Sequence, residues 1–366
     1  MHKIASVHVW SEDLNLSRPY TIAFRTINSV QAFYVLLRLE DGTYGVGSGN
    51  PSKLVTGEDF DISLRRMQAE LPAQLIGADI RALPAVSYRL GKLWANSPAA
   101  RAAIDIALHD LHTKRLGIPL LDYFGRAVPD LPTSITIGIK DTLEETLEEA
   151  REYLDRNFRH IKLKIGKDPV ADAQTCHELM ALIGKDAYVR VDGNQGYTAE
   201  DLDHFVNATT DLALELIEQP LPVGQTDEMR RLPANLRTLS AADEDLLSTD
   251  DAFDLACTPV PFGIFNIKLM KCGGPAAGRR IGQTAAHAGI QLMWGCNDES
   301  PISIAAALHT ALSMPNTKFI DLDGSLDLAD TLAEGGFSIS NGTMSILPDR
   351  PGLGVSMSKS VLEKYA

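Results

Sequence analysis

The chain has 366 residues, of which 45% are hydrophobic and 22% are charged, and its formal net charge is −14 with a pI near 5.1. This composition is that of an ordinary globular protein with enough apolar side chains for a large core. The acidic balance argues against nucleic acid and anionic membrane surfaces as partners, because both bind basic patches.

The sequence also favours a cytoplasmic location. The N-terminus, MHKIASVHVWSEDL, lacks the long apolar run of a signal peptide, and no stretch reaches the roughly 18 apolar residues of a membrane span. The cysteines, at positions 176, 257, 272 and 296, show neither CxxC nor Cys/His spacing. We therefore expect free thiols in a reducing compartment.

Residues 1–125 are predicted to form a small α+β domain. The stretches KIASVHVW and AFYVLLRLEDGTYGVGSG are typical of strands, and Asp41-Gly42 in the second is a hairpin signal. The pattern becomes helical from residue 60. In SPAARAAIDIALHDLHTKRLG, Pro98 marks a helix start and Gly117 marks its end.

From about residue 131, strand-like and helical segments alternate. The expected strands are residues 133–139, 160–165, 187–192, 213–218, 238–243, 264–269, 290–295 and 318–323. Their regular spacing favours an α/β fold of the (β/α)8 type, a modified TIM barrel, over an open sheet. We assign residues 126–323 to this catalytic barrel. The tail, residues 324–366, is expected to be irregular and to pack back on the first domain, so that both ends of the chain form a capping domain.

Nearly every expected strand ends in a charged residue. These are Lys162 and Lys164, Asp192, Glu218, Asp243, Lys268, Asp298, and the pair Asp321 and Asp323. Catalytic groups of such barrels lie at the C-terminal ends of the strands, so we expect these side chains to meet at the barrel mouth. A single acid at a strand end is often only a helix N-cap.

Three of these carboxylates, Asp192, Glu218 and Asp243, end consecutive strands. Together they would repel one another and raise one another's pKa values. A hard dication relieves this repulsion, and Mg²⁺ prefers such oxygen ligands while leaving positions for substrate. The sequence therefore predicts a Mg²⁺ site.

Lysines come before and after this carboxylate group along the chain. Lys162 and Lys164 alternate with apolar residues in HIKLKIGKD, so they share one face of a strand, and Lys268 lies on the far side. Two amines on opposite sides of a metal-held carboxylate suit 1,1-proton transfer. A neighbouring cation and Mg²⁺ are expected to lower the pKa of the working lysine from about 10.4 to roughly 7–8.

The motifs KLKIG, VRVDGNQGY, ELIEQPLP, AADEDLL, FNIKLMKCGG and PGLGV, in this order, resemble the enolase superfamily in its muconate-lactonizing subgroup. The resemblance implies one Mg²⁺ per subunit, bound by Asp192, Glu218 and Asp243. It also implies that Lys164 and Lys268 are the two acid/base residues. Lys162 would then tune Lys164 and help to hold the substrate carboxylate.

Within this subgroup, Asp321-Leu322-Asp323 resembles the Asp-x-Asp motif by which dipeptide epimerases bind the α-ammonium group of the substrate. Two carboxylates on one strand face suit an –NH₃⁺ group, although they could also be solvated acids of the barrel rim. The stretch VTGE, residues 55–58, resembles the same group, and Thr136 resembles a position that holds the substrate carboxylate. Residues 47–50, Gly-Ser-Gly-Asn, lack the Gly-Glu that relatives often carry there.

Two residues bear on the substrate side chains. Arg25 resembles an arginine that some Ala-Glu epimerases place on a capping loop for the glutamate, or it could pair elsewhere or point away. Asp298 resembles the acid of members that take dipeptides of Lys and Arg, and a buried Asp298 facing a substrate glutamate would be unfavourable. The sequence therefore favours a cationic side chain.

The resulting prediction is a Mg²⁺-dependent dipeptide epimerase that inverts the α-carbon of the C-terminal residue of an L,L-dipeptide. The alternatives are an L-Ala-D/L-Glu epimerase, an N-acylamino acid racemase and an o-succinylbenzoate synthase. A non-catalytic binding barrel is disfavoured by the intact lysines and carboxylates. Barrel enzymes of this type are often homo-oligomers, although no segment of the sequence indicates an interface.

Overall fold

The computed structural model describes residues 2–22, 25–53 and 55–365, with the side chains of residues 18–28 left aside. The chain begins with an antiparallel sheet of β1 (Ile4–Ile22), β2 (Arg25–Leu39) and β3 (Tyr44–Gly49). The predicted hairpin turn between β2 and β3 is confirmed. Its Gly42 has a φ of +86°, and Asp41 Oδ1 accepts a hydrogen bond of 3.0 Å from the Thr43 N–H.

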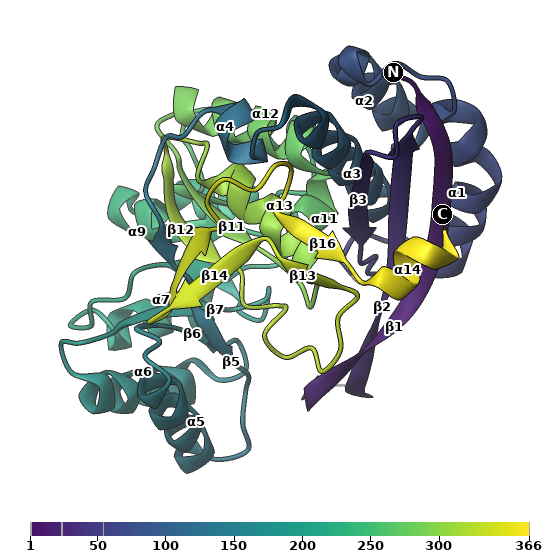
Figure 1. Cartoon of the computed structure of the whole chain (residues 1–366). Helices are drawn as coiled ribbons and strands as arrows, with labels where there is room; N and C mark the ends of the chain where they lie inside the picture. The colour runs from purple at the N-terminus through teal and green to yellow at the C-terminus, as the bar shows by residue number, and fades with distance from the viewer. Residues whose placement is uncertain (1, 23–24, 54, 366) are drawn as a thin grey trace.

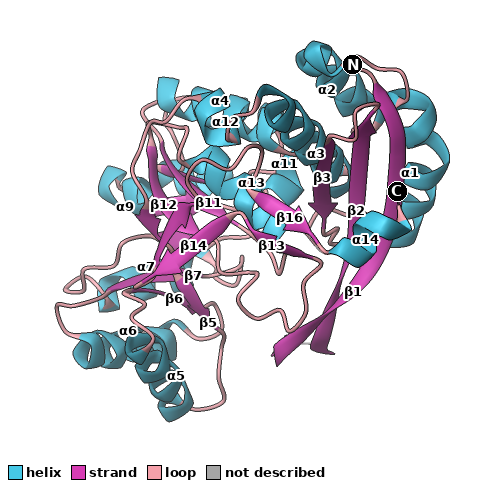
Figure 2. Ribbon diagram, viewed as in Figure 1, coloured by secondary structure: helices cyan, strands magenta, loops and turns pink. Residues whose placement is uncertain are grey.

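Helices follow this sheet and cover it (Figures 1 and 2). They are α1 (Phe60–Leu75), the 3₁₀ helix η1 (Ile80–Ala82), α2 (Leu83–Leu93), α3 (Pro98–Leu116) and α4 (Leu120–Phe124). The predicted helix between Pro98 and Gly117 is confirmed as α3. It packs so closely on β3 that a Cβ at Gly47 would lie 1.9 Å from the Ala103 carbonyl oxygen. Only glycine allows this approach.

A second sheet forms the barrel. Among the described residues it has eight parallel strands in the order β12-β11-β10-β9-β8-β7-β6-β5. A bridge between Thr133 and Ile320 brings its two edges together. The strands are β5 (Ile135–Ile137), β6 (His160–Lys164), β7 (Tyr188–Asp192), β8 (Ile217–Glu218), β9 (Ser240–Ala242), β10 (Ile264–Ile267), β11 (Gln291–Gly295) and β12 (Thr317–Asp321). The predicted barrel is confirmed.

Helices surround these strands. They are α5 (Leu143–Asp155), α6 (Pro169–Ile183), α7 (Ala199–Ala208), α8 (Thr226–Arg231), α9 (Ala234–Leu239), α10 (Thr249–Leu255), α11 (Leu269–Cys272), α12 (Pro275–His287) and α13 (Pro301–Ala311). Thr142 and Thr198 form capping boxes at the start of α5 and α7. No helix in the described part of the chain is both long and apolar enough to cross a membrane.

The tail is more regular than predicted. Strand β13 (Ala333–Gly335) pairs with β16 (Val355–Met357), and β14 (Phe337–Ser340) pairs with β15 (Thr343–Ile346), which also pairs with β4 (Leu131–Pro132). The missed signal was Asn341-Gly342, a two-residue hairpin turn in which both residues have positive φ. The expectation of an irregular tail was therefore wrong.

The end of the tail contacts the first sheet. Helix α14 (Lys359–Lys364) lies beside β1 and β2 (Figure 1). Arg38 of β2 donates hydrogen bonds to the carbonyl oxygens of Leu362, at 3.0 Å, and Tyr365, at 3.2 Å. The Tyr365 ring stacks on Trp10 with 4.5 Å between centroids. Segments from both ends of the chain are thus packed together.

Candidate active site

Three buried carboxylates lie side by side at the ends of β7, β8 and β9. Asp192 and Glu218 are register partners, and Asp243 lies two residues beyond Ala241, the partner of Glu218. Because side chains two apart on a strand share a face, all three point to the barrel interior. Their exposed fractions are only 0%, 0% and 2%. The predicted convergence of these acids is therefore present in the fold.

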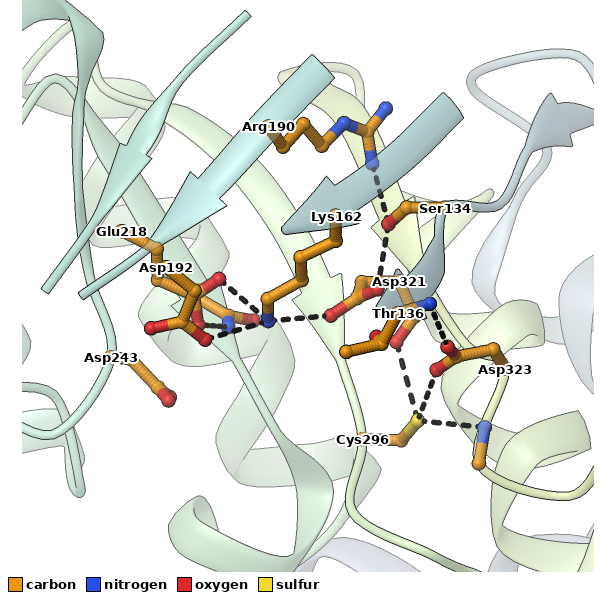
Figure 3. Close-up of polar contacts among 12 residues, drawn as sticks. Ser134, Thr136, Lys162, Arg190, Asp192, Glu218, Asp243, Cys296, Asp321 and Asp323 are labelled. Atoms are coloured by element: carbon orange, nitrogen blue, oxygen red, sulfur yellow. Dashed lines mark hydrogen bonds and ion pairs between the residues drawn. The ribbon is translucent and has the colours of Figure 1, made fainter. Parts of the chain in front are cut away.

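Lysines contact this row from one side. Lys162 Nζ on β6 lies 2.8 Å from Glu218 Oε2, 2.9 Å from Asp321 Oδ2 and 3.0 Å from Asp192 Oδ2 (Figure 3). Lys164 Nζ lies 2.7 Å from Asp192 Oδ2 and 2.8 Å from Asn194 Oδ1. The Lys164 side chain is 28% exposed and that of Lys162 only 4%. Lys164 is thus the more accessible lysine of this pair.

The opposite side of the row also carries lysines. Lys268 follows β10, and its Nζ lies 2.9 Å from Asp243 Oδ2. Lys271 donates to Asp243 Oδ1 and, at 2.6 Å, to the Asp243 carbonyl oxygen. In the sheet, β6 and β10 flank the strands of the three acids. The arrangement therefore has amines on both sides of one carboxylate group.

The charges of this cluster shift its pKa values in opposite directions. Burial, together with the charge of Asp192, raises the pKa of Glu218 to about 7 despite the nearby Lys162. Burial also raises the pKa of Asp243, but Lys268 and Lys271 lower it by more, so the net shift is well downward. Asp192 is likewise held ionised by Lys162 and Lys164.

The same ion pairs also shift the pKa values of Lys268 and Lys162. Burial lowers the pKa of Lys268, but the charges of Asp243 and Glu218 raise it by more, and the net shift is upward. The pKa of Lys162 is raised in the same way by Asp192, Asp321 and Glu218. The lowering predicted for the working lysine depends on Mg²⁺, whose positive charge would offset that of these carboxylates. A lysine in this cluster can act as a base only when another cation neutralises the carboxylates.

The carboxylates of Asp192, Glu218 and Asp243 offer oxygen donors to a divalent cation. In residues 2–22, 25–53 and 55–365 no three His, Cys, Asp or Glu side chains are arranged as a metal cluster. Ammonium groups contact the oxygens of Asp192 and Asp243. Glu218 Oε2 is buried with the Lys162 ammonium group as its ion-pair partner, and the set consists of hard carboxylate oxygens alone. These residues therefore fit Mg²⁺.

Asp321 and Asp323 lie at the end of β12, beside the amino-terminal part of β5. Asp321 is 3% exposed, and its Oδ1 accepts a hydrogen bond of 2.6 Å from Ser134 Oγ. Asp323 is half-buried, and its Oδ2 accepts a hydrogen bond of 2.9 Å from the Thr136 N–H. Burial and the charge of Asp321 raise the pKa of Asp323 to about 7. Asp321 is therefore not a solvated acid of the rim.

Two residues, Asp298 and Arg25, were predicted to contact the side chains of the substrate, and the structure describes the side chain of Asp298 only. Asp298 is half-buried in the loop after β11, next to the buried Glu299, whose Oε1 accepts a hydrogen bond of 2.9 Å from the Asn297 N–H. Burial raises the pKa of Glu299 to about 7. Arg25 begins β2, but its side chain lies outside the described part of the chain.

Sequence reasoning missed several supporting residues. Asn266 donates a hydrogen bond of 2.7 Å to Glu218 Oε1, and its position two residues before Lys268 could have placed it on the inner face. Ser134 and Lys271 carried no comparable signal. In the VTGE stretch, Glu58 accepts a hydrogen bond of 2.7 Å from the Ala99 N–H, so it caps α3. That contact is structural and lies in the first domain.

The chain was compared with known proteins. Residues 4–125 match the family described as Mandelate racemase / muconate lactonizing enzyme, N-terminal domain, and residues 145–361 match Enolase C-terminal domain-like. An L-Lys-D/L-Arg epimerase of Desulforapulum autotrophicum is 48% identical over 353 residues, which are 96% of this chain and 99% of that protein. An L-Ala-D/L-Glu epimerase of Bacillus subtilis is 29% identical over 343 residues, 93% of each chain.

A solved structure is also similar. The dipeptide epimerase of Methylococcus capsulatus, in complex with Mg and the dipeptide L-Arg-D-Lys, superposes with a TM-score of 0.94 at 48% identity. The match covers 96% of this chain and 99% of that one. The similarity therefore extends over both the first sheet with its helices and the barrel.

Proposed function

Since the chain belongs to the enolase superfamily, in its mandelate racemase and muconate lactonizing enzyme group, we propose that it is a Mg²⁺-dependent epimerase of dipeptides with cationic side chains. It is an isomerase that inverts the α-carbon of the C-terminal residue of an L,L-dipeptide. The observation that carries this proposal is the row of three buried carboxylates with lysines on both sides.

The roles of the chain's own groups follow from this arrangement. Asp192, Glu218 and Asp243 would hold Mg²⁺, which when bound would supply positive charge against the negative charge that develops on the substrate carboxylate. Lys164, the more exposed lysine of β6, exchanges a proton with one face of the α-carbon. Lys268 exchanges a proton with the other face. Taking a proton from one face and returning one to the other inverts the centre.

The remaining site residues hold the substrate. Asp321 and Asp323 provide two carboxylates beside the mouth for the α-ammonium group, and Lys162 and Thr136, which contact these two acids, help to hold the substrate carboxylate. Asp298 faces the cationic side chain. Arg25, at the start of β2, is proposed to contribute to substrate specificity from the capping domain.

The alternatives fit less well. The L-Ala-D/L-Glu epimerase of Bacillus subtilis is 29% identical, against 48% for the L-Lys-D/L-Arg epimerase, and Asp298 disfavours a substrate glutamate. An N-acylamino acid racemase or an o-succinylbenzoate synthase would place an acyl group or a carboxylate where Asp321 and Asp323 lie. A non-catalytic barrel would not need lysines on both sides of the acids.

The test is a dipeptide library incubated with the enzyme and Mg²⁺ in D₂O and analysed by mass spectrometry. Deuterium should enter dipeptides built from Lys and Arg, and their L,D epimers should accumulate. Preferred exchange of Ala-Glu, or exchange of N-acyl amino acids without dipeptides, would contradict the proposal. N-acyl amino acids whose acyl chain carries the side chain of the N-terminal residue are the matched control, because they lack only the α-ammonium group.

We further propose a cytoplasmic location and a homo-oligomeric assembly. All four cysteines are free thiols, which suits a reducing compartment. Fractionation of the native cell, and light scattering of the purified enzyme, would test these two expectations separately.

A further inference from the structure

A buried chain of polar side chains runs through the barrel below the proposed site. Arg190 donates a hydrogen bond of 3.1 Å to Ser134 Oγ, and Ser134 donates one of 2.6 Å to Asp321 Oδ1. The other oxygen of Asp321 accepts a hydrogen bond of 2.9 Å from Lys162 Nζ. Figure 3 shows this series ending at the carboxylates of Asp192 and Glu218. The exposed fractions of Arg190, Ser134, Asp321 and Lys162 are between 0% and 3%.

Arg190 is held rigidly within this chain. Its Nε donates a hydrogen bond of 2.8 Å to Glu215 Oε2, and its NH1 donates one of 2.8 Å to the Ile320 carbonyl oxygen. The guanidinium carbon lies 4.9 Å from the centre of the Phe319 ring. A planar guanidinium with its donors used on several sides has little freedom to rotate. The position of the N–H that faces Ser134 is therefore fixed by the fold.

This contact determines the direction of the Ser134 hydroxyl. An arginine N–H can only donate, so Ser134 Oγ must accept from Arg190. The single hydroxyl proton of Ser134 is then available for an acceptor, and Asp321 Oδ1 at 2.6 Å is much nearer than the Ile320 carbonyl oxygen at 3.4 Å. The hydroxyl thus donates to Asp321, and a hydrogen bond to an ionised carboxylate is among the stronger ones in proteins.

From these contacts we infer that Ser134 and Arg190 are positioning residues for the epimerisation. They fix the carboxylate of Asp321, and through it they keep a third carboxylate beside the Lys162 ammonium group, which also contacts Asp192 and Glu218. Neither residue touches the substrate. This inference rests on the proposed function, since it gives the pair the task of orienting groups that bind the dipeptide.

The effect of Ser134 on the site passes through Lys162, whose ammonium group is shared among three carboxylates. Its Nζ lies within 3.0 Å of three carboxylates, so it moves toward whichever of them are best placed. Without the bond from Ser134, Asp321 is free to rotate away. Lys162 is then left with Asp192 and Glu218 alone, so its charge competes more strongly with a dication there and contributes less to holding the substrate carboxylate.

The variant Ser134→Ala tests this inference, with Ser240→Ala as the matched control. Ser240 is also fully buried on a barrel strand, but its hydroxyl donates 2.9 Å to the Leu236 carbonyl oxygen of α9. Both variants should lose a similar amount of thermal stability. For a cationic dipeptide, KM should rise about tenfold or more in Ser134→Ala, the loss expected for one hydrogen bond to a charged group. It should stay within twofold of the unmodified enzyme in Ser240→Ala.

A second measurement does not depend on the substrate. Mg²⁺ binding to the full chain, followed by isothermal titration calorimetry, should weaken about threefold or more in Ser134→Ala and not in Ser240→Ala. If Ser134→Ala fails to fold, Ser134→Cys keeps the side-chain volume with a much weaker donor and should change both quantities in the same direction.

The outcomes are separable. Unchanged KM and unchanged Mg²⁺ affinity in a folded Ser134→Ala would overturn the inference. An equal rise in KM and an equal loss of Mg²⁺ affinity in Ser134→Ala and Ser240→Ala would also overturn it. Absence of dipeptide epimerisation by the unmodified enzyme would refute the proposed function instead, and the Mg²⁺ titration would still decide the role of Ser134.

Discussion

Replacing Lys268 by methionine should abolish epimerisation while leaving proton exchange at one epimer. Lys268 is the proposed acid/base on the β10 side of the carboxylate row, and Lys164 on the β6 side remains. Loss of one positioned acid/base group costs roughly 10²–10⁴-fold in rate. The remaining lysine can still exchange the α-proton that points toward it, so deuterium should enter one of the two epimers only.

The fold should survive this change. The Lys268 side chain is 10% exposed and pairs with Asp243, so its removal takes away a buried contact. Lys271 still donates to Asp243, however, so the carboxylate keeps a cation as partner. We therefore expect a loss of about 2 kcal/mol in the free energy of unfolding, the typical contribution of a hydrogen bond to a charged group.

The assay uses separate L,L and L,D samples of one Lys/Arg dipeptide in D₂O with Mg²⁺. NMR follows loss of the α-proton, and chiral chromatography follows epimer conversion. Lys185→Met, a change at an exposed lysine before β7, is the control and should behave like the unmodified enzyme. A folded Lys268→Met that epimerises within tenfold of the unmodified rate, or that exchanges both epimers equally, would refute the assignment of Lys268.

Three further predictions concern specificity, metal and pH. Asp298→Asn should lower kcat/KM for Lys/Arg dipeptides about tenfold relative to uncharged ones, because the substrate cation loses a carboxylate partner; an unchanged preference across the panel would exclude Asp298 as the determinant. Chelation with EDTA should stop exchange and added Mg²⁺ should restore it, and exchange that persists in EDTA would argue against the metal role of the carboxylates. Burial raises the pKa of Glu299 from 4.5 to about 7, so between these values the native state keeps a proton that the unfolded chain has lost. Stability of the unmodified enzyme should therefore fall across this range relative to Glu299→Gln, by about 3 kcal/mol in total. Urea unfolding of both proteins at a series of pH values measures this, and a difference that does not change with pH would contradict it.

Much of the fold is encoded locally in the sequence. The alternation in HIKLKIGKD places Lys162 and Lys164 on one face of a strand, and β6 is found at His160–Lys164. Strands that alternate with helices must be parallel, so their carboxyl ends meet at one edge. For this reason the approach of Asp192, Glu218 and Asp243 could be predicted from strand order alone.

Other features depend on contacts between distant segments. Ser134 and Asp321 are separated by 187 residues, and they meet only because the two edges of the barrel sheet close at Thr133 and Ile320. The sequence by itself determined the strands, the inner faces and the residue types at the mouth, because these follow from periodicity. Only the tertiary structure decided which ammonium group contacts which carboxylate, and how deeply each is buried. Those two quantities set the pKa values and the strength of each ion pair, and neither can be read from the order of residues along the chain.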